Sequence, residues 1–418
     1  MPVAGLRDSF DSLSRETALV VGLISGSQFF NHAYLVLLPP IFTVLSAEFD
    51  TTIAVLGTVM GAQALANTVV HLPFGYLADN YDRTIALGLS SVFGGVGALA
   101  TAFATTVPEL FLAQVVLGLG IGGHHPSHYP LLTDATDEDA RGRAFGIYNF
   151  GGSLGFATPP VFITAVIALQ GYSWRHAVGA IGAVGLLYAV VSTAVIRWRV
   201  SGDVTEPNVK AATEGKPLAE RLRAELRGIV ASPGILALAA LALFSSTANW
   251  GVTSYAVVFL TSDVYGASLG LANLTLTGIY VVGAGAILVG GYLTDRSGGG
   301  PVLVASFVSF TVLVALIAAG VVPALGAVAL FLLLGATRSM AGPARDHLTG
   351  ELAAGGTTAK SFAVVSVGIM LGSAIAPPAF GYLIEGFGVQ AAFFAVAAVG
   401  LATTLVTLVV VGAYADGG

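Results

Sequence analysis

Long apolar blocks dominate this chain and restrict its fold more than any other feature. Stretches such as 18–45 and 302–322 are near or above the roughly 20 residues that an α-helix needs to cross about 30 Å of hydrocarbon. Charged residues make up only 10% of the 418 residues, whereas a soluble domain carries about 25%. The short alternating segments of a membrane β-barrel are missing. The sequence therefore predicts an all-α integral membrane protein.

Breaks at Gly, Pro and charged clusters predict twelve spans in two groups of six. The expected spans lie near 18–45, 52–78, 84–105, 108–133, 142–169, 175–197, 234–261, 268–293, 301–321, 324–349, 358–384 and 389–413. We expect an N-terminal bundle and a C-terminal bundle, joined by a polar linker with one amphipathic helix and flanked by short cytoplasmic termini. The corresponding ranges are 1–17, 18–198, 199–232, 233–413 and 414–418.

The basic residues predict the orientation of the spans. With a cytoplasmic N-terminus, all 17 Lys and Arg lie on the inner side except Arg175, which falls outside, and Arg338, which falls within a span. The positive-inside rule therefore favours a multi-pass protein of the cell membrane with both termini in the cytoplasm.

Short motifs recur between the two groups of spans. GYLAD at 75–79 returns as GYLTD at 291–295, and PPVF at 159–162 returns as PPAF at 377–380. The offsets are 216 and 218 residues, so they are nearly constant. Duplication of a six-helix unit is the simplest explanation, and we expect two pseudo-symmetric six-helix bundles.

These motifs resemble the major facilitator superfamily over essentially the whole chain. The signature loop of that family, G-x-L-x-D-R-x-G-R-[RK], appears as GYLADNYDRT after span two and as GYLTDRSGGG after span eight. Segments such as GGHHPSHYPLLTD and RGRAFGIYNFGGSLGFATPP resemble its fosmidomycin-resistance branch of drug or metabolite exporters. The chain departs from many such relatives at His32, where they carry an acidic residue, and at Gln114, where proton-coupled members carry arginine.

The resemblance implies a cytoplasmic gate built from the two signature loops. Glycines would let helices of opposite halves approach closely, and carboxylates at the rim would pair with cations at the start of spans five and eleven. Asp295 would face Arg141 and Arg143, and Asp79 would face Lys360. The expected gate residues are Gly75, Asp79, Arg83, Asp134, Arg141, Arg143, Gly291, Asp295, Arg296, Glu351 and Lys360.

Polar side chains inside the spans mark an expected substrate or proton pathway. The resemblance implies that spans one, four, seven and ten line a central cavity, whereas spans three, six, nine and twelve, which are nearly bare of such residues, face lipid. A charge at mid-membrane costs at least roughly 2.5 to 3.5 kcal/mol, so Arg338 is expected to face a protein interior or a wet cavity. The expected pathway residues are Asn31, His32, Tyr34, Gln114, His124, His128, Asn249, Trp250 and Arg338.

The segment GIGGHHPSHYP, residues 120–130, has three interpretations. His124 and His128 have the spacing of a helical zinc pair, but no third ligand or catalytic carboxylate is nearby, so no metal is expected. Pro126 and the matched Pro343 predict two kinked helices, with the histidines as hydrogen-bonding residues. Alternatively, His124 or His128 contacts substrate or carries a proton.

Together these features predict a secondary transporter that works by alternating access and exports a small organic, anionic or zwitterionic, drug or metabolite with proton coupling. The chain contains no ATP-binding loop, and neither a cofactor nor a nucleic-acid partner is expected. We expect the protein to act as a monomer in the lipid bilayer and not as an enzyme. An organic-anion uptake symporter or facilitator, and a non-transporting membrane sensor, are the alternatives.

Overall fold

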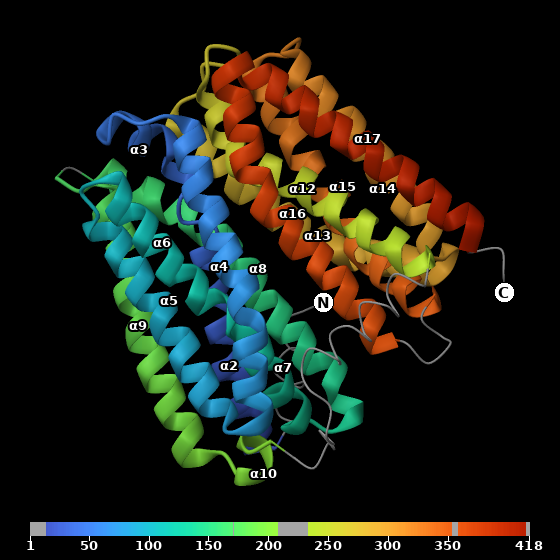
Figure 1. The fold of residues 1–418 in the computed structure, drawn as a ribbon. Helices are drawn as coiled ribbons and strands as arrows, with labels where there is room; N and C mark the ends of the chain where they lie inside the picture. The colour runs from blue at the N-terminus through green and yellow to red at the C-terminus, as the bar shows by residue number, and fades with distance from the viewer. Residues whose placement is uncertain (1–13, 170, 208–232, 353–357, 415–418) are drawn as a thin grey trace. The chain divides into compact units, whose positions relative to one another are not determined.

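The structure is a computed structural model that describes residues 14–169, 171–207, 233–352 and 358–414. Within these ranges it contains twelve helical segments long and apolar enough to cross a membrane, which agrees with the sequence prediction. In chain order (Figure 1) the elements are α2 (Arg15–Leu35), η1 (Pro39–Ile41), α3 (Phe42–Glu48), α4 (Ile53–Asn80), α5 (Arg83–Phe103), α6 (Val107–Gly122), α7 (His124–Asp134), α8 (Glu138–Ala168), α9 (Trp174–Arg199), α10 (Gly202–Thr205), α12 (Pro233–Thr261), α13 (Leu269–Ser297), α14 (Gly299–Ala319), α15 (Ala324–Leu352), α16 (Thr358–Phe387) and α17 (Val389–Tyr414).

The first span differs from the single helix expected over 18–45. Its helix begins earlier, at Arg15, because the Ser14 hydroxyl accepts a hydrogen bond from the Thr17 amide and caps the first turn. It stops at Leu35, and a short 3-10 turn over Pro39–Ile41 follows, since proline offers no amide hydrogen to continue the helical ladder. TM span one is therefore two helices, α2 and α3.

The expected linker is only partly described. Its first residues continue α9 to Arg199 and then form the short helix α10. The amphipathic helix expected further along the linker lies outside the described residues.

The chain forms two compact units. Unit 1 contains the described residues within 1–37 and 65–212, and unit 2 contains those within 38–64 and 213–418. Thus η1, α3 and the first part of α4 pack in unit 2, together with helices of the second half of the chain. The ring of Phe42, for example, lies 5.7 Å from that of Tyr255, and the Ser254 hydroxyl lies 3.5 Å from the sulfur of Met60.

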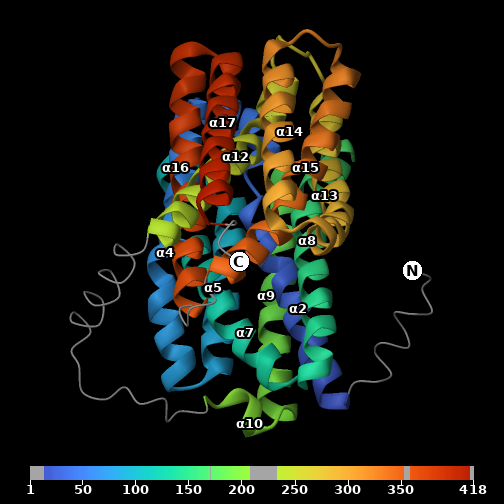
Figure 2. The ribbon, with the colours of Figure 1, turned by 90° about the vertical axis from the view of Figure 1, so that its right-hand side faces the viewer.

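Both units repeat the same helix pairings, which is the structural sign of duplication. In unit 1, α2 packs against α8, and α5 packs against both α6 and α9. In unit 2, the corresponding α12 packs against α16, and α14 packs against both α15 and α17 (Figure 2). The first half therefore pairs span one with five, three with four, and three with six. The second half pairs span seven with eleven, nine with ten, and nine with twelve in the same way. The expected pair of pseudo-symmetric six-helix bundles is confirmed.

Glycines bring several of these helices into backbone contact. A Cβ at Gly97 of α5 would collide with the backbone of Leu117 on α6, and one at Gly335 of α15 would collide with the backbone of Ile279 on α13. Small residues serve this purpose in membrane interiors, where packing rather than the hydrophobic effect holds helices together.

Other glycines leave space for tyrosine side chains, of which Tyr34 is buried and Tyr188 half buried. A Cβ at Gly185 of α9 would occupy the position of the Tyr34 hydroxyl, and one at Gly26 of α2 would occupy that of the Tyr188 hydroxyl. The Tyr188 hydroxyl donates to the carbonyl of Leu23 at 2.9 Å. These spaces allow large polar aromatic side chains to lie inside the first bundle.

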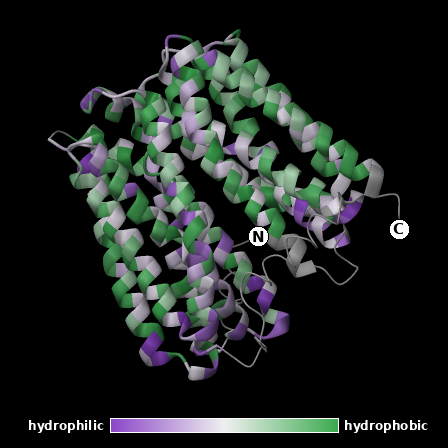
Figure 3. Cartoon of the chain, in the orientation of Figure 1, coloured by the Kyte–Doolittle hydropathy of each residue, from purple (hydrophilic) through white to green (hydrophobic). Residues whose placement is uncertain are grey.

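The outer surfaces of the helices are apolar. Large hydrophobic side chains such as Leu72, Leu187 and Leu288 are exposed. Figure 3 shows hydrophobic residues along the lengths of the helices and hydrophilic ones gathered toward helix ends. Such a surface is compatible with lipid and not with water. The protein is a multi-pass membrane protein.

Candidate functional site

Four imidazole side chains gather inside unit 1, and we call them the histidine cluster: His32 of α2 and His124, His125 and His128 of α7. The ring centroids of His124 and His128 lie 4.9 Å apart, and those of His32 and His125 lie 6.4 Å apart. Three of these residues belong to the pathway that the sequence predicts. The fourth, His125, joins them through its contacts with His32 of α2 and Tyr148 of α8.

A break between α6 and α7 positions the cluster. The helix is interrupted at Gly123, and Pro126 lacks the amide hydrogen that would bond to the carbonyl of Gly122. A Cβ at Gly123 would lie 2.6 Å from both Phe74 and Ser90, so only glycine fits at this turn. In unit 2 the matched Pro343 lies within the continuous helix α15, which shows no such interruption.

The two histidines on one face of α7 are fully enclosed and hydrogen-bonded. His124 is 1% exposed, and its Nδ1 lies 2.7 Å from the Ser90 hydroxyl and 2.9 Å from the Gly120 carbonyl. His128 is completely buried, and its Nε2 lies 3.1 Å from the hydroxyl of Ser27 on α2. Each imidazole thus connects α7 to a neighbouring helix.

Tyr148 of α8 connects the remaining imidazole to the cluster. Its hydroxyl lies 3.0 Å from Nδ1 of His125 and 3.2 Å from Nδ1 of His128. Tyr148 is completely buried, whereas His125 is only half buried. Of Tyr148, His128 and His125, His125 is therefore the residue that reaches the surface of the unit.

His32 lies beside an amide pair on its own helix. Its Nε2 is 2.7 Å from the amide nitrogen of Gln28, and the Gln28 oxygen accepts a long hydrogen bond, 3.5 Å, from the amide of Asn31. The ring of Phe156 on α8 covers His32 at a centroid distance of 4.2 Å. Asn31 is 1% exposed and its Oδ1 has no hydrogen-bond partner among the described residues.

The donor set of the cluster does not resemble a metal site. Among the residues that the structure describes, no group of three or more His, Cys, Asp or Glu side chains converges closely enough to hold a metal ion. The imidazole nitrogens of His124, His125 and His128 face hydroxyl groups instead. Neutral hydroxyls and imidazoles in contact form a hydrogen-bond network that can pass protons.

Two other expected pathway residues of unit 1 have different surroundings: Tyr34 lines a small cavity together with His124, whereas Gln114 faces α5. Gln114 of α6 is completely buried and donates to the hydroxyl of Thr101 on α5 at 2.8 Å. Tyr34 of α2 is 1% exposed and its ring stacks obliquely on Phe30, at a centroid distance of 6.3 Å. Gln114 thus faces α5 and not the histidines.

Arg338 organises a second polar group, which lies within unit 2 and which we call the arginine cluster: Arg338, Thr253 and Tyr280. Nη1 of Arg338 donates to the Thr253 hydroxyl at 3.1 Å, and the guanidinium lies 5.2 Å from the centre of the Tyr280 ring. The ring face attracts the cation. No carboxylate of the described residues forms an ion pair with Arg338.

The remaining expected pathway residues, Asn249 and Trp250, lie on α12 about one turn before Thr253, and both are half buried. Oδ1 of Asn249 is buried without a hydrogen-bond partner in the described part of the chain. Because residues four apart share one face of a helix, Asn249 lies on the same side of α12 as Thr253.

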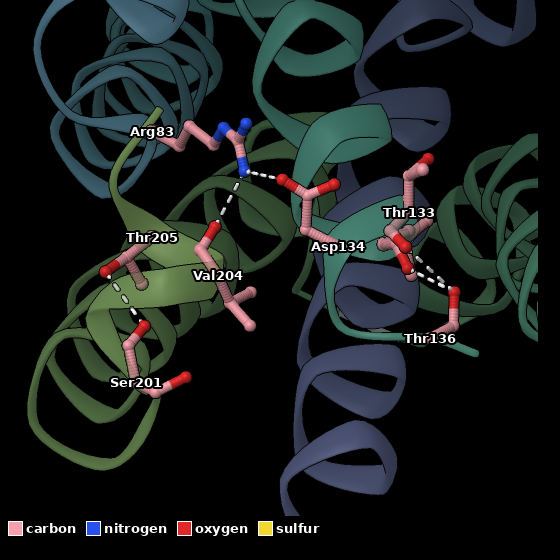
Figure 4. Close-up of polar contacts among 8 residues, drawn as sticks. Arg83, Thr133, Asp134, Thr136, Ser201, Val204 and Thr205 are labelled. Carbon is pink, nitrogen blue, oxygen red and sulfur yellow. Dashed lines mark hydrogen bonds and ion pairs between the residues drawn. The ribbon is translucent and has the colours of Figure 1, made fainter. Parts of the chain in front are cut away.

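Two of the expected gate residues form an ion pair inside unit 1. Nη1 of Arg83, at the start of α5, lies 2.5 Å from Oδ2 of Asp134, at the end of α7, and 2.8 Å from the carbonyl of Val204 in α10 (Figure 4). Arg83 is 7% exposed. The pair therefore holds α5, α7 and α10 together, and a role in gating stays a prediction.

The neighbouring Asp82 has a structural role that is absent from our sequence-based predictions. It is a departure from the signature loop, and its carboxylate caps α5 by accepting from the amides of Thr84 and Ile85 at 2.6 and 3.2 Å. It also lies 3.5 Å from Nη1 of Arg197 on α9. A search for Asp two or three residues before a predicted helix start would have identified it.

The other expected gate residues make few contacts within their own units. Asp79, Asp295 and Arg143 are exposed. Arg296 lies over the Tyr292 ring at 4.6 Å, and Glu351 lies 3.5 Å from Nδ1 of His347.

Three further expected gate residues also lack a tight contact. Nε of Arg141 is buried without a partner among the described residues, and a Cβ at Gly75 or Gly291 would meet no atom within 4 Å. The side chain of Lys360 lies outside the described part of the chain. The gate stays a prediction.

Comparison with known proteins gives relatives that include a drug-resistance protein and named transporters. The chain is 25% identical, over 71% of its length and 70% of the relative's, to the fosmidomycin resistance protein of Escherichia coli (strain K12). It is 34% identical, over 35% of its length and 32% of the relative's, to the 4-hydroxybenzoate transporter PcaK of Pseudomonas putida.

A solved structure and a family model cover nearly the whole chain. A bacterial homologue of the human lysosomal transporter Spinster superposes with a TM-score of 0.79 at 16% identity, covering 96% of this chain and 98% of that one. The model of the Major Facilitator Superfamily matches residues 24–271 and 239–415. The spans, the duplicated helix pairings and these matches show that the chain belongs to the major facilitator superfamily.

Proposed function

We propose that this protein is a secondary active transporter that works by alternating access and exports a small organic anion, drug or metabolite, with protons as the coupling ion. The observation that carries this proposal is Arg338. A guanidinium near the middle of a membrane-spanning helix costs at least roughly 2.5 to 3.5 kcal/mol on insertion scales, so such residues face binding sites or wet cavities.

The surroundings of Arg338 favour an anionic ligand. Its described partners, Thr253 and Tyr280, are neutral, so no carboxylate of the described residues balances its charge. A guanidinium has five N–H donors in a planar fork that matches carboxylate and phosphonate groups, and its contacts with Thr253 and Tyr280 leave part of that fork available. Asn249 and Trp250, on the helix that carries Thr253, add an unpaired amide oxygen and an aromatic surface.

The relatives support the same class of solute. One is named for resistance to fosmidomycin and another for transport of 4-hydroxybenzoate, an aromatic carboxylate. Export is favoured because a relative that aligns over 71% of this chain is named a resistance protein. The histidine cluster supports protons as the coupling ion, because histidine is the side chain whose unperturbed charge changes near neutral pH.

Flux into proteoliposomes tests the proposal. We expect purified protein to accumulate radiolabelled 4-hydroxybenzoate or fosmidomycin inside the vesicles when their interior is made acidic, because protons then leave as the solute enters. This accumulation should disappear when a protonophore collapses the pH gradient. Arg338→Gln should abolish accumulation, and Arg338→Lys, which keeps the charge but not the planar fork, should retain part of it. Arg197→Gln is the matched control, because Arg197 is 59% exposed and far along the chain from this cluster.

The alternatives give different outcomes in this assay. Undiminished accumulation in Arg338→Gln would contradict the anion site. Equilibration without accumulation would indicate a facilitator, and accumulation only with the opposite gradient would indicate an uptake symporter. Binding of both probes without any flux would indicate a non-transporting sensor.

We also propose that the protein lies in the cell membrane as a monomer with both termini in the cytoplasm and acts as a transporter, not an enzyme. The distribution of Lys and Arg along the chain supports this orientation. A fluorescent protein fused to the C-terminus should fluoresce, whereas a periplasmic phosphatase fused there should be inactive. The reverse pattern would contradict the orientation.

A further inference from the structure

Hydroxyl and imidazole groups in unit 1 form one continuous series of contacts across four helices, which we call the hydroxyl–imidazole chain. Its members in order are His125, Tyr148, His128, Ser27, Ser91, His124 and Ser90. The successive atom-to-atom distances are 3.0, 3.2, 3.1, 3.4, 3.5 and 2.7 Å. The series begins at a half-buried residue, and each of the following members is less than 9% exposed.

Each inner member of the chain can both donate and accept a proton. A hydroxyl carries one hydrogen and free lone pairs, and a neutral imidazole has one N–H and one bare nitrogen. Both nitrogens of His128 are used, with Tyr148 on one side and Ser27 on the other. Both nitrogens of His124 are also used, with Ser91 on one side and Ser90 and the Gly120 carbonyl on the other.

All hydrogen bonds of the series can therefore run from donor to acceptor in either direction along the chain. In one arrangement Tyr148 donates to His128, which donates to Ser27, and Ser91 donates to His124. In the other every hydrogen is reversed, and His124 donates to Ser91. No link is blocked in either arrangement, because none of the members is restricted to accepting.

A small cavity lies at the two longest links. It has a volume of about 10 Å³, and Ser27, Tyr34, Ser91 and His124 supply its polar lining. A cavity of roughly 10–15 Å³ with two or more polar partners accommodates one water molecule. A water here would lie within reach of Ser27, Ser91 and His124 and would keep the series continuous across the 3.4 and 3.5 Å contacts.

The groups that surround the chain set its electrostatics. Titratable side chains that face it from α2, α4, α7 and α9 are His32, Tyr34, His71, Tyr129 and Tyr188. No carboxylate of the described residues is hydrogen-bonded to any member. A proton in the chain would therefore be held by neutral imidazoles and hydroxyls and not by an ion pair, which suits rapid release.

We infer that the hydroxyl–imidazole chain conducts the coupling proton between the surface of unit 1 at His125 and an interior site at His124. This inference rests on the proposed proton-coupled transport and adds its route. The route includes Ser27, Ser91 and Tyr148, none of which belongs to the pathway expected from the sequence.

The transfer conserves protons at every atom. A proton binds Nε2 of His125, and the hydrogen on its Nδ1 passes to the oxygen of Tyr148. Tyr148 releases its own hydrogen to Nδ1 of His128, which gives the hydrogen on Nε2 to Ser27. Ser27 and Ser91 each take one hydrogen and release one, directly or through the water.

His124 ends as an imidazolium whose Nδ1–H points at the Gly120 carbonyl. Rotation of the hydroxyl groups, together with a return of the ring hydrogens of His125 and His128 to their original nitrogens by tautomerisation or ring rotation, then restores the starting direction of the series. One proton has been bound and none created or lost.

A pH step on a solid-supported membrane tests this route without a transported solute. Proteoliposomes of the full chain are adsorbed to the sensor, and the buffer is changed from pH 8 to pH 6. Proton entry from His125 to His124 moves charge within the membrane dielectric, so wild-type protein should give a transient current that protein-free liposomes do not. Protonation of exposed side chains outside the bilayer moves little charge through it.

Removal of single oxygen atoms should interrupt the current. Tyr148→Phe and Ser27→Ala are expected to lose it to the level of protein-free liposomes, whereas Ser27→Thr, which keeps a hydroxyl, should retain it. The matched controls are Tyr265→Phe and Ser245→Ala in unit 2, whose hydroxyls donate to the carbonyls of Ile317 and Ala242. Both should give the wild-type current.

The inference is overturned if wild-type protein gives no current, or if Tyr148→Phe or Ser27→Ala gives the full current. Thermal unfolding of each variant shows that a lost current does not come from lost folding, and Ser27→Thr provides a second check. Accumulation of 4-hydroxybenzoate driven by a pH gradient, without any current from the pH step, would overturn the route and leave the proposed transport intact.

Discussion

The Arg83–Asp134 pair should contribute measurably to the stability of unit 1, and Asp134→Asn tests this. The side chain of Arg83 is 9% exposed and that of Asp134 is 29% exposed. Asparagine keeps an acceptor oxygen 2.5 Å from the guanidinium but removes the negative charge. A hydrogen bond to a charged group contributes roughly 1.5–3 kcal/mol, and removal of one partner of a fully buried ion pair costs roughly 3–5 kcal/mol.

Partial exposure of Asp134 reduces the expected loss, because water screens part of the interaction. We therefore expect the free energy of unfolding to fall by about 2 kcal/mol, which corresponds to about 5 °C in Tm for a unit of this size. Thermal unfolding in detergent can be followed by tryptophan fluorescence, since Trp174 and Trp198 lie in α9 of unit 1. Trp250→Phe removes the reporter in unit 2.

The matched control is the exposed pair formed by Arg197 and Asp82. Its atoms are 3.5 Å apart and the Arg197 side chain is 59% exposed, so Arg197→Gln should cost less than about 1 kcal/mol. If Asp134→Asn melts at the wild-type temperature, or no lower than Arg197→Gln, the argument that burial of Arg83 makes its ion pair important is wrong.

Two further predictions use the same thermal assay. Gly97→Ala should lower stability by roughly 1–3 kcal/mol, because its Cβ would collide with the Leu117 backbone, whereas Gly75→Ala, whose Cβ meets nothing within 4 Å, should leave it unchanged. Gln114→Leu should change stability by less than about 1 kcal/mol: its Oε1 already lacks a partner among the described residues, and Thr101 keeps its bond to the Gly97 carbonyl. A large loss in Gln114→Leu would show that this amide has a partner essential to the fold.

The overall architecture could be predicted from the sequence because membranes impose a simple length rule. A span must be about 20 apolar residues long, and its ends are marked by charge, so twelve helices could be counted without a structure. The observed helix boundaries differ from the predicted ones where a capping side chain or a proline sets the helix end. The helix start at Arg15 depends on the Ser14 cap, and the split of the first span depends on Pro39 and Pro40.

The histidine cluster was predictable only in part. Spacing places His124 and His128 on one face, but the partners of these residues come from elsewhere in the sequence. Ser90 and Ser91 lie in span three, which is predicted to face lipid, and they contact His124 directly. That prediction was wrong for this part of the span, because serine is small and polar and gives no hydropathy signal inside an apolar helix.

The ion pairs illustrate a second limit. Asp134 and Arg83 were both identified as candidate gate residues, yet the structure joins them to each other within one unit. The sequence cannot rank pairs of opposite charge at the same membrane face, since every rim residue has several partners within reach. Geometry resolves this choice, as it does for Asp82 and Arg197.

The close contacts of Tyr34 and Tyr188 with glycines have a consequence for sequence evolution. Tyr34 fits only because Gly185 has no side chain, and Tyr188 fits only because Gly26 has none. Each glycine and its aromatic partner share one volume, so the glycine cannot gain a side chain while the tyrosine stays. Homologues with alanine or a larger residue at the position of Gly185 should carry a smaller residue at that of Tyr34, and the two columns should covary although 151 positions separate them.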